Sequence, residues 1–194
     1  MSAQVFFVQG GGRGAHDAWD SKLVASLKKE LGRGYSVRYP RMPGEANPDT
    51  AAWKRAIARE LRKLSDEVIL IGHSIGAAIL FDYLADGGQG GRPAAIFLIS
   101  NPFIGDEGWP SEELRPTKDA ATDLPKGVPI YVYHGTADGT VPVSHLEMFA
   151  KALPGAIVRR LEGRDHQLNG DLSELAHDIK RLERAPGRHS HARS

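Results

Sequence analysis

The sequence predicts an α/β fold in which a parallel sheet of about six strands lies between two layers of helices. Short apolar runs of strand length alternate with longer runs that repeat apolar residues at helical spacing. This alternation is typical of a parallel sheet whose strands are joined by helices. Candidate reactive residues also directly follow predicted strands, which is where open parallel sheets bind ligands.

The six predicted strands are rich in Val, Ile, Phe or Tyr and cover residues 4–8, 35–39, 68–71, 94–99, 129–133 and 156–161. The last strand alternates with arginines, so we expect it near an edge of the sheet. Three helix starts are predicted between the strands. Asp17 is expected to cap one helix, Asn47-Pro48 to open the next, and Ser144 with Glu147 to form a capping box.

Length and composition favour one domain with its own core. The 194 residues form a predicted single domain over 1–184 and a flexible basic tail over 185–194. Lysine plus arginine (25) nearly balance aspartate plus glutamate (24), so no nucleic-acid partner is expected. The absence of cysteine excludes thiolate catalysis and disulfides. We find no signal peptide and no membrane-spanning run, and we expect a soluble cytoplasmic protein without a membrane partner.

The stretch from Glu67 to Asp86 organises the chain. It places Gly72-His73-Ser74-Ile75-Gly76 between a buried strand and an apolar helix. A G-x-S-x-G turn in this context lifts the serine hydroxyl off the sheet edge, and glycines allow strand and helix to approach closely. The alternative is an ordinary tight turn in which Ser74 caps the helix.

Candidate acid and base groups lie in later loops. Asp138 follows the strand at 129–133, and His166 follows the strand at 156–161. The order Ser, Asp, His is the order of an α/β-hydrolase triad. Asp138 could also be a plain turn residue because Asp-Gly favours turns. The sequence leaves Asp106, Asp123 and Asp165 open as weaker alternatives for the acid.

Four motifs give the chain a close resemblance to the α/β-hydrolase family: QGGG at 9–12, GHSIG at 72–76, YHGTADGTVP at 133–142 and GRDH at 163–166. In detail the chain resembles small single-domain bacterial serine hydrolases of the retinoblastoma-binding-protein-9 type. The resemblance implies a three-layer α/β-hydrolase fold with a minimal lid. The chain departs from the family pattern at Gln9, where histidine is common. It also lacks a full lid domain, which argues against long-chain lipase activity.

The resemblance also implies catalytic roles. Ser74 is expected to be the nucleophile, His166 the base and Asp138 the acid that orients it. The backbone amides of Ile75 and Gly11 are expected to stabilise the oxyanion. Such a site needs no metal or organic cofactor.

Three further residues are candidate substrate contacts. Phe103 and Trp109 lie in the long 101–127 segment, which we interpret as a functional loop or small cap. They could form an apolar pocket over Ser74 or simply pack the segment onto the domain. His16 lies near the glycine loop and could line the pocket or serve the structure.

We therefore expect a serine hydrolase that cleaves a small carboxylic ester. The same residues would serve an amidase, peptidase, thioesterase or C–C hydrolase, because fold and triad do not specify the substrate. A hydrolase-like binding module without turnover is the alternative from another class.

Overall fold

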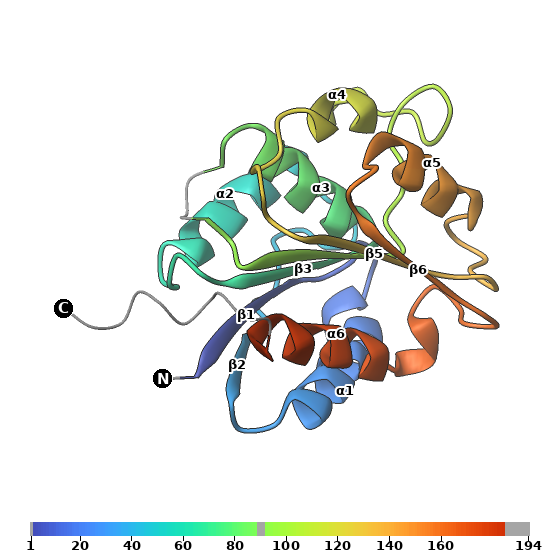
Figure 1. Ribbon diagram of the computed structural model, residues 1–194. Helices are drawn as coiled ribbons and strands as arrows, with labels where there is room; N and C mark the ends of the chain where they lie inside the picture. Colours follow the sequence, from blue (N-terminus) through green and yellow to red (C-terminus); the bar gives the residue numbers. More distant parts are fainter. Residues whose placement is uncertain (1, 89–91, 185–194) are drawn as a thin grey trace.

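A six-stranded parallel sheet forms the middle layer of the computed structural model, which describes residues 2–88 and 92–184 (Figure 1). Its strands lie in the order β2-β1-β3-β4-β5-β6, and each neighbouring pair is parallel. Their bounds are β1 Ala3–Val8, β2 Tyr35–Arg38, β3 Ile69–His73, β4 Ala95–Ile99, β5 Ile130–Gly135 and β6 Ile157–Leu161. The predicted number of strands is confirmed in this part of the chain, and β6 lies at an edge. The tail at 185–194 lies outside the described residues.

Helices cover both faces of the sheet (Figure 1). On one face lie α2 (Thr50–Leu61), α3 (Ser74–Ala85), α4 (Thr117–Ala121) and α5 (Ser144–Ala152). On the other lie α1 (Ser21–Leu31) and α6 (Ser173–Arg184), with two short helical turns, η1 (Ala15–Asp20) and η2 (Leu168–Gly170). The three-layer α/β-hydrolase architecture expected from the sequence is therefore present.

Strand alternation explains the two cores. In β1, Phe6 and Val8 pack into one core, whereas Val5 and Phe7 pack into the other, because successive side chains point to opposite faces. The helix α3 is apolar nearly all round and is buried along almost its whole length. Burial of α3 against the centre of the sheet fixes the position of its first residue, Ser74.

The predicted helix starts are wrong in detail. Asp49, not Asn47, caps α2, because its extended backbone lets the carboxylate accept a hydrogen bond from the Ala52 amide at 2.6 Å. Ser144 is the first residue of α5 and makes no capping bond. Asp17 lies inside the π-helical turn η1, where its carboxylate pairs with Arg41.

The 101–127 segment forms a small cap beside α3. Ile104 and Trp109 form an isolated β-bridge, and the short helix α4 follows. The minimal lid expected from the sequence agrees with this compact arrangement. Among the described helices, none combines the length and apolar character needed to cross a bilayer.

Very close backbone contacts hold the turn at Ser74. A Cβ atom added to Gly76 would lie 1.9 Å from the Gln9 carbonyl oxygen, and one added to Gly72 would lie 2.6 Å from the Ala77 Cα. Ser74 itself has a φ of 54°, in the left-handed region that is unfavourable for a non-glycine residue. The packing at the two glycines therefore maintains a strained backbone at Ser74.

Replacement of Gly76 by alanine should destabilise the fold, because the added methyl group cannot avoid the Gln9 backbone. We expect the free energy of unfolding to fall by about 1–3 kcal/mol or more, measured by urea denaturation. Gly155→Ala is the matched control, because a Cβ there meets no atom within 4 Å. Equal stability of the two variants would contradict a tight contact at Gly76.

Candidate functional site

Ser74, Asp138 and His166 meet at the carboxyl edge of the sheet. Ser74 follows β3, Asp138 follows β5, and His166 follows β6. His166 Nε2 lies 2.9 Å from Ser74 Oγ, and His166 Nδ1 lies 2.8 Å from Asp138 Oδ2. A carboxylate only accepts hydrogen bonds, so Nδ1 carries the proton and Nε2 can accept the hydrogen bond from the serine hydroxyl.

Asp138 is held as an anion. Burial alone would raise its pKa, but hydrogen bonds from His134, His166 and the Val141 amide outweigh burial and keep the pKa well below its ordinary value. The Thr140 and Val141 amides both donate to Oδ1 at 2.8 Å. The carboxylate is thus fixed in orientation toward the imidazole ring of His166.

Backbone contacts tie the loops that carry Asp138 and His166. The Ala137 amide donates to the Arg164 carbonyl at 3.0 Å, and the Gly163 amide donates to Thr136 Oγ1 at 2.8 Å. A Cβ at Gly135 would lie 2.1 Å from the Arg164 carbonyl oxygen, so only glycine permits this approach. Residues far apart in the sequence therefore form one rigid corner.

The two residues predicted to supply the oxyanion donors pack closely against each other. A Cβ on Gly11 would come within 2.7 Å of Ile75 Cγ2. The Gly10 amide donates to Asp20 and the Gly12 amide to the Glu45 carbonyl, whereas the Gly11 amide has no partner among the described residues. Ile75 lies in the first turn of α3, where amides lack partners within the helix.

Two cavities open on either side of Ser74. The first, of about 360 Å³, is lined by Gly10, Gly11, Gly12, Arg13, Ala15, Trp19, Asp20, His73, Ser74, Thr140, His166 and Gln167. The second, of about 410 Å³, is lined by Gly11, Pro48, Thr50, Ser74, Ile75, Ile79, Trp109, Ser111, Glu113, Leu114 and Thr140. We call them the His166-side cavity and the Trp109-side cavity. Only the first contains His166, and the second is the more apolar.

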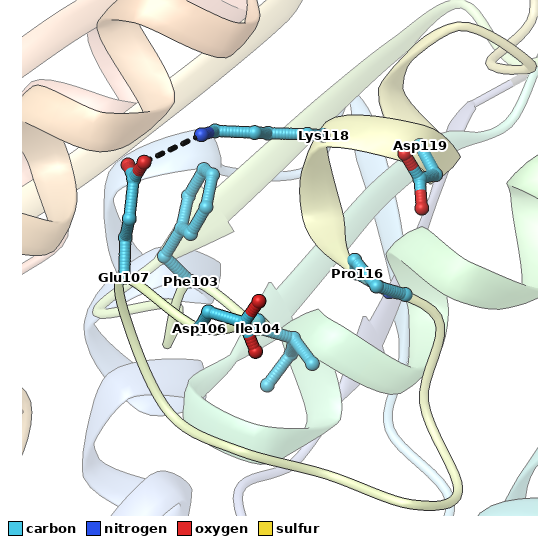
Figure 2. Close-up of a pocket in the computed structure, with 8 residues that line it drawn as sticks. Phe103, Ile104, Asp106, Glu107, Pro116, Lys118 and Asp119 are labelled. Carbon is cyan, nitrogen blue, oxygen red and sulfur yellow. Dashed lines mark hydrogen bonds and ion pairs between the residues drawn. The ribbon is translucent and has the colours of Figure 1, made fainter.

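The three predicted substrate contacts lie in different places. Trp109 lines a cavity with Ser74. Phe103 does not: it is buried against Phe149 and borders a separate hollow of about 270 Å³ (Figure 2). His16 stacks on Tyr39 at 4.3 Å and lines neither cavity beside Ser74. For Phe103 and His16 the structure thus favours the packing alternative.

Nearby histidines and the alternative acids have other partners. His134 Nε2 donates to the Val141 carbonyl and lies 3.2 Å from the Asp138 carboxylate, which braces the acid, and His145 Nδ1 accepts from the Phe103 amide. Asp165 binds the amides of Gln167 and Asn169. The remaining weaker acid candidates are also distant from the serine: Asp106 borders the hollow in Figure 2, and Asp123 pairs with Arg115. Among the described residues, no His, Asp and Glu cluster is arranged to hold a metal ion.

Comparisons with known proteins agree with this fold. The sequence model of the alpha/beta hydrolase family matches residues 5–185, which is most of the chain. The chain belongs to the alpha/beta hydrolase family. This membership places it among the hydrolases.

Individual relatives are distant. Lipase 1 of Candida albicans is 24% identical over 163 residues, which span 81% of this chain but only 32% of the lipase. The ydeN gene product of B. subtilis has a TM-score of 0.72 at 17% identity and covers 94% of this chain and 100% of its own. XC6422 of Xanthomonas campestris, a serine hydrolase without a lid, has a TM-score of 0.62 at 18% identity and covers 94% and 81%. These structural likenesses show a shared fold.

A buried pair beneath Ser74 connects three loops of this hydrolase. His73 Nδ1 lies 2.9 Å from the Asp20 carboxylate, and Nε2 lies 3.0 Å from the His166 carbonyl oxygen. The Asp20 carboxylate also accepts from the Gly10 amide at 2.6 Å, and Ser100 Oγ donates to the same His166 carbonyl at 3.0 Å. The glycine loop, the serine turn and the histidine loop are therefore held by one hydrogen-bond network.

The hydrogen bonds of this network fit a charged pair. Both ring nitrogens of His73 face oxygen acceptors, so an imidazolium facing the Asp20 carboxylate satisfies every contact. Burial would lower the pKa of His73, but the Asp20 charge and its hydrogen bond outweigh burial and raise the pKa. We interpret His73 and Asp20 as an ion pair inside the protein.

A second network positions the glycine loop. The Glu45 carboxylate accepts from Gln9 Nε2 at 2.7 Å, from the His16 amide at 3.0 Å and from the Gly14 amide at 3.2 Å. Gln9 Oε1 accepts from the Met42 amide at 2.9 Å. The glutamine that replaces the family's common histidine thus points away from Ser74 and braces the loop from behind.

Sequence reasoning missed Asp20 and Glu45. Neither belongs to a motif, and both precede the serine turn by many residues, so no local pattern marks them. The buried Asp20 side chain is recognisable only when the glycine loop, η1 and the serine turn are seen together.

The buried pair predicts a large effect for Asp20→Asn. Loss of the carboxylate leaves His73 buried without its counter-charge, and we expect the free energy of unfolding to fall by about 3–5 kcal/mol. Asp17→Asn is the control, since its exposed pair with Arg41 is screened by solvent and should contribute little to stability. Denaturant unfolding of both variants measures the difference, and similar values would contradict a buried ion pair.

The charge state of His73 can be observed directly. We expect two exchange-protected ring N–H signals from His73 at neutral pH, persisting above pH about 6.5, where an ordinary histidine loses its charge. Proton and nitrogen NMR of labelled protein measures these signals, with His73→Gln to assign them. A single ring N–H signal at neutral pH would show that His73 is uncharged.

Proposed function

We propose that this protein is a serine hydrolase that cleaves small carboxylic esters. The observation that carries the proposal is the continuous hydrogen-bonded series Asp138–His166–Ser74, with distances of 2.8 and 2.9 Å. These are the groups that acyl transfer through a covalent intermediate requires.

In the proposed reaction, Ser74 Oγ attacks the ester carbonyl carbon while His166 Nε2 takes its proton. Negative charge then forms on the carbonyl oxygen, where the amides of Gly11 and Ile75 stabilise it. His166 passes the proton to the leaving oxygen, the alcohol departs, and an acyl-Ser74 ester remains. Water, activated by His166, then releases the carboxylic acid and regenerates the serine.

The two cavities predict how the substrate is oriented at Ser74. Because His166 must protonate the leaving oxygen, the leaving group belongs in the His166-side cavity. The acyl group then occupies the Trp109-side cavity, whose walls include the apolar side chains of Ile75, Trp109 and Leu114. Its volume of about 410 Å³ suits a short or medium acyl chain.

The relatives support hydrolysis of esters. The Candida albicans relative is a lipase, which is an ester hydrolase, and the protein from Xanthomonas campestris is a serine hydrolase without a lid. The chain covers about a third of the lipase, so that enzyme's substrates are not carried over.

A kinetic comparison distinguishes ester cleavage from cleavage of other bonds. A matched ester and anilide with the same acyl group separate an esterase from an amidase, and a matched thioester separates a thioesterase. We expect the ester to have the highest kcat/KM. A higher kcat/KM for the anilide or the thioester would show that the ester assignment is wrong, while the proposed catalytic triad would stand.

A fluorophosphonate probe tests the nucleophile. We expect the wild-type protein to be labelled, Ser74→Ala to lose labelling, and His166→Ala to react more slowly by a factor on the order of 10⁴ to 10⁶. The measurement is covalent labelling followed by mass spectrometry of the modified peptide. Lack of labelling in a folded wild-type protein would favour a binding module without turnover.

A further inference from the structure

Arg13 and Trp19 lie on the wall of the His166-side cavity without an explained structural role. Arg13 is exposed and forms no hydrogen bond or ion pair with the part of the chain that the structure describes. The other charged groups on this wall, Asp20 and His73, are buried and paired with each other, and Asp20 also accepts from the Gly10 amide. Among the described residues that line the cavity, Arg13 is therefore the free positive charge.

Trp19 adds a flat apolar surface to the same wall. It is 53% exposed and belongs to the π-helical turn η1. Single π-helical turns are rare and often occur at functional sites. Here the Asp20 side chain points inward to the glycine loop, where it accepts from the Gly10 amide. The neighbouring Trp19 lines the cavity.

The opposite cavity has the opposite charge. Glu113 lines the Trp109-side cavity and accepts a hydrogen bond from the Thr50 amide at 3.3 Å. A negatively charged acyl group would be repelled there, whereas a negatively charged leaving group would be attracted by Arg13. The charges on the two walls therefore favour the same substrate orientation as His166, with the leaving group in the His166-side cavity.

We propose that the natural substrate carries an anionic, flat leaving group, such as a ring with a carboxylate, which pairs with Arg13 and packs on Trp19. An arginine side chain binds a carboxylate through two parallel hydrogen bonds, and an indole packs well on a planar ring. This inference rests on the proposed function, because it places the leaving group beside His166.

The test compares two esters of the same acid: para-carboxyphenyl butyrate and para-carbamoylphenyl butyrate. They have the same shape and differ in the charge of the leaving group. The measured quantity is the ratio of kcat/KM for the anionic ester to that for the neutral ester. Comparing this ratio between variants cancels the different intrinsic reactivities of the two esters.

We expect Arg13→Gln to lower the ratio roughly fivefold and Arg13→Glu to lower it further, with both effects reduced at high salt. Arg33→Gln is the matched control, because Arg33 is an exposed arginine just before β2, at the opposite end of the sheet. Trp19→Ala should lower kcat/KM for both phenyl esters by a similar factor and leave the ratio unchanged.

The outcomes separate the two proposals. If the neutral ester is hydrolysed in a Ser74-dependent manner but Arg13→Gln and Arg13→Glu leave the ratio at the wild-type value, the anionic leaving group is wrong and the serine hydrolase stands. An equal change of the ratio in Arg33→Gln would also overturn the role of Arg13. If the wild-type protein hydrolyses neither ester and takes no fluorophosphonate label, the proposed function itself fails.

Discussion

The site depends on the contact between the Gln9 carbonyl and Gly76. This contact brings the glycine loop after β1 against the first turn of α3, and it leaves no room for a side chain at Gly76. The same approach packs Gly11 against Ile75 while Ser74 keeps its unfavourable backbone angle. Packing of the apolar helix α3 against the centre of the sheet supplies the stability that opposes this strain.

Two polar networks, one buried and one partly buried, hold the segments that the backbone contact brings together. The Asp20–His73 pair reaches the glycine loop on one side and the His166 carbonyl on the other. Glu45 holds the glycine loop from behind through Gln9 and two amides. A buried charged pair adds little to stability compared with a well-packed apolar core, because desolvation opposes its attraction. Its clearer effect here is to define one arrangement of loops that are far apart in the sequence.

The site combines a fixed centre with open, chemically different walls. Ser74 and His166 are mostly buried and the Asp138 side chain is fully covered, so water has little access to the hydrogen bonds between them. The walls on either side differ in polarity and charge, with Arg13 on one and Glu113 on the other. In such an arrangement the centre sets the reaction and the walls set the orientation of the substrate. Members of a fold family can therefore share the centre and differ in the walls.

The sequence by itself determined the strands, the layers and the positions of Ser74, Asp138 and His166 at the ends of strands. These features depend on local patterns: apolar runs, helical spacing and a glycine-flanked serine. Tertiary structure decided which acid lies 2.8 Å from His166, the roles of Asp20 and Glu45, and the burial of Phe103 away from Ser74. It also decided the helix starts, where Asp49 rather than Asn47 caps α2. These features depend on contacts between segments distant in sequence, and a linear pattern does not contain the distances and directions that such contacts require.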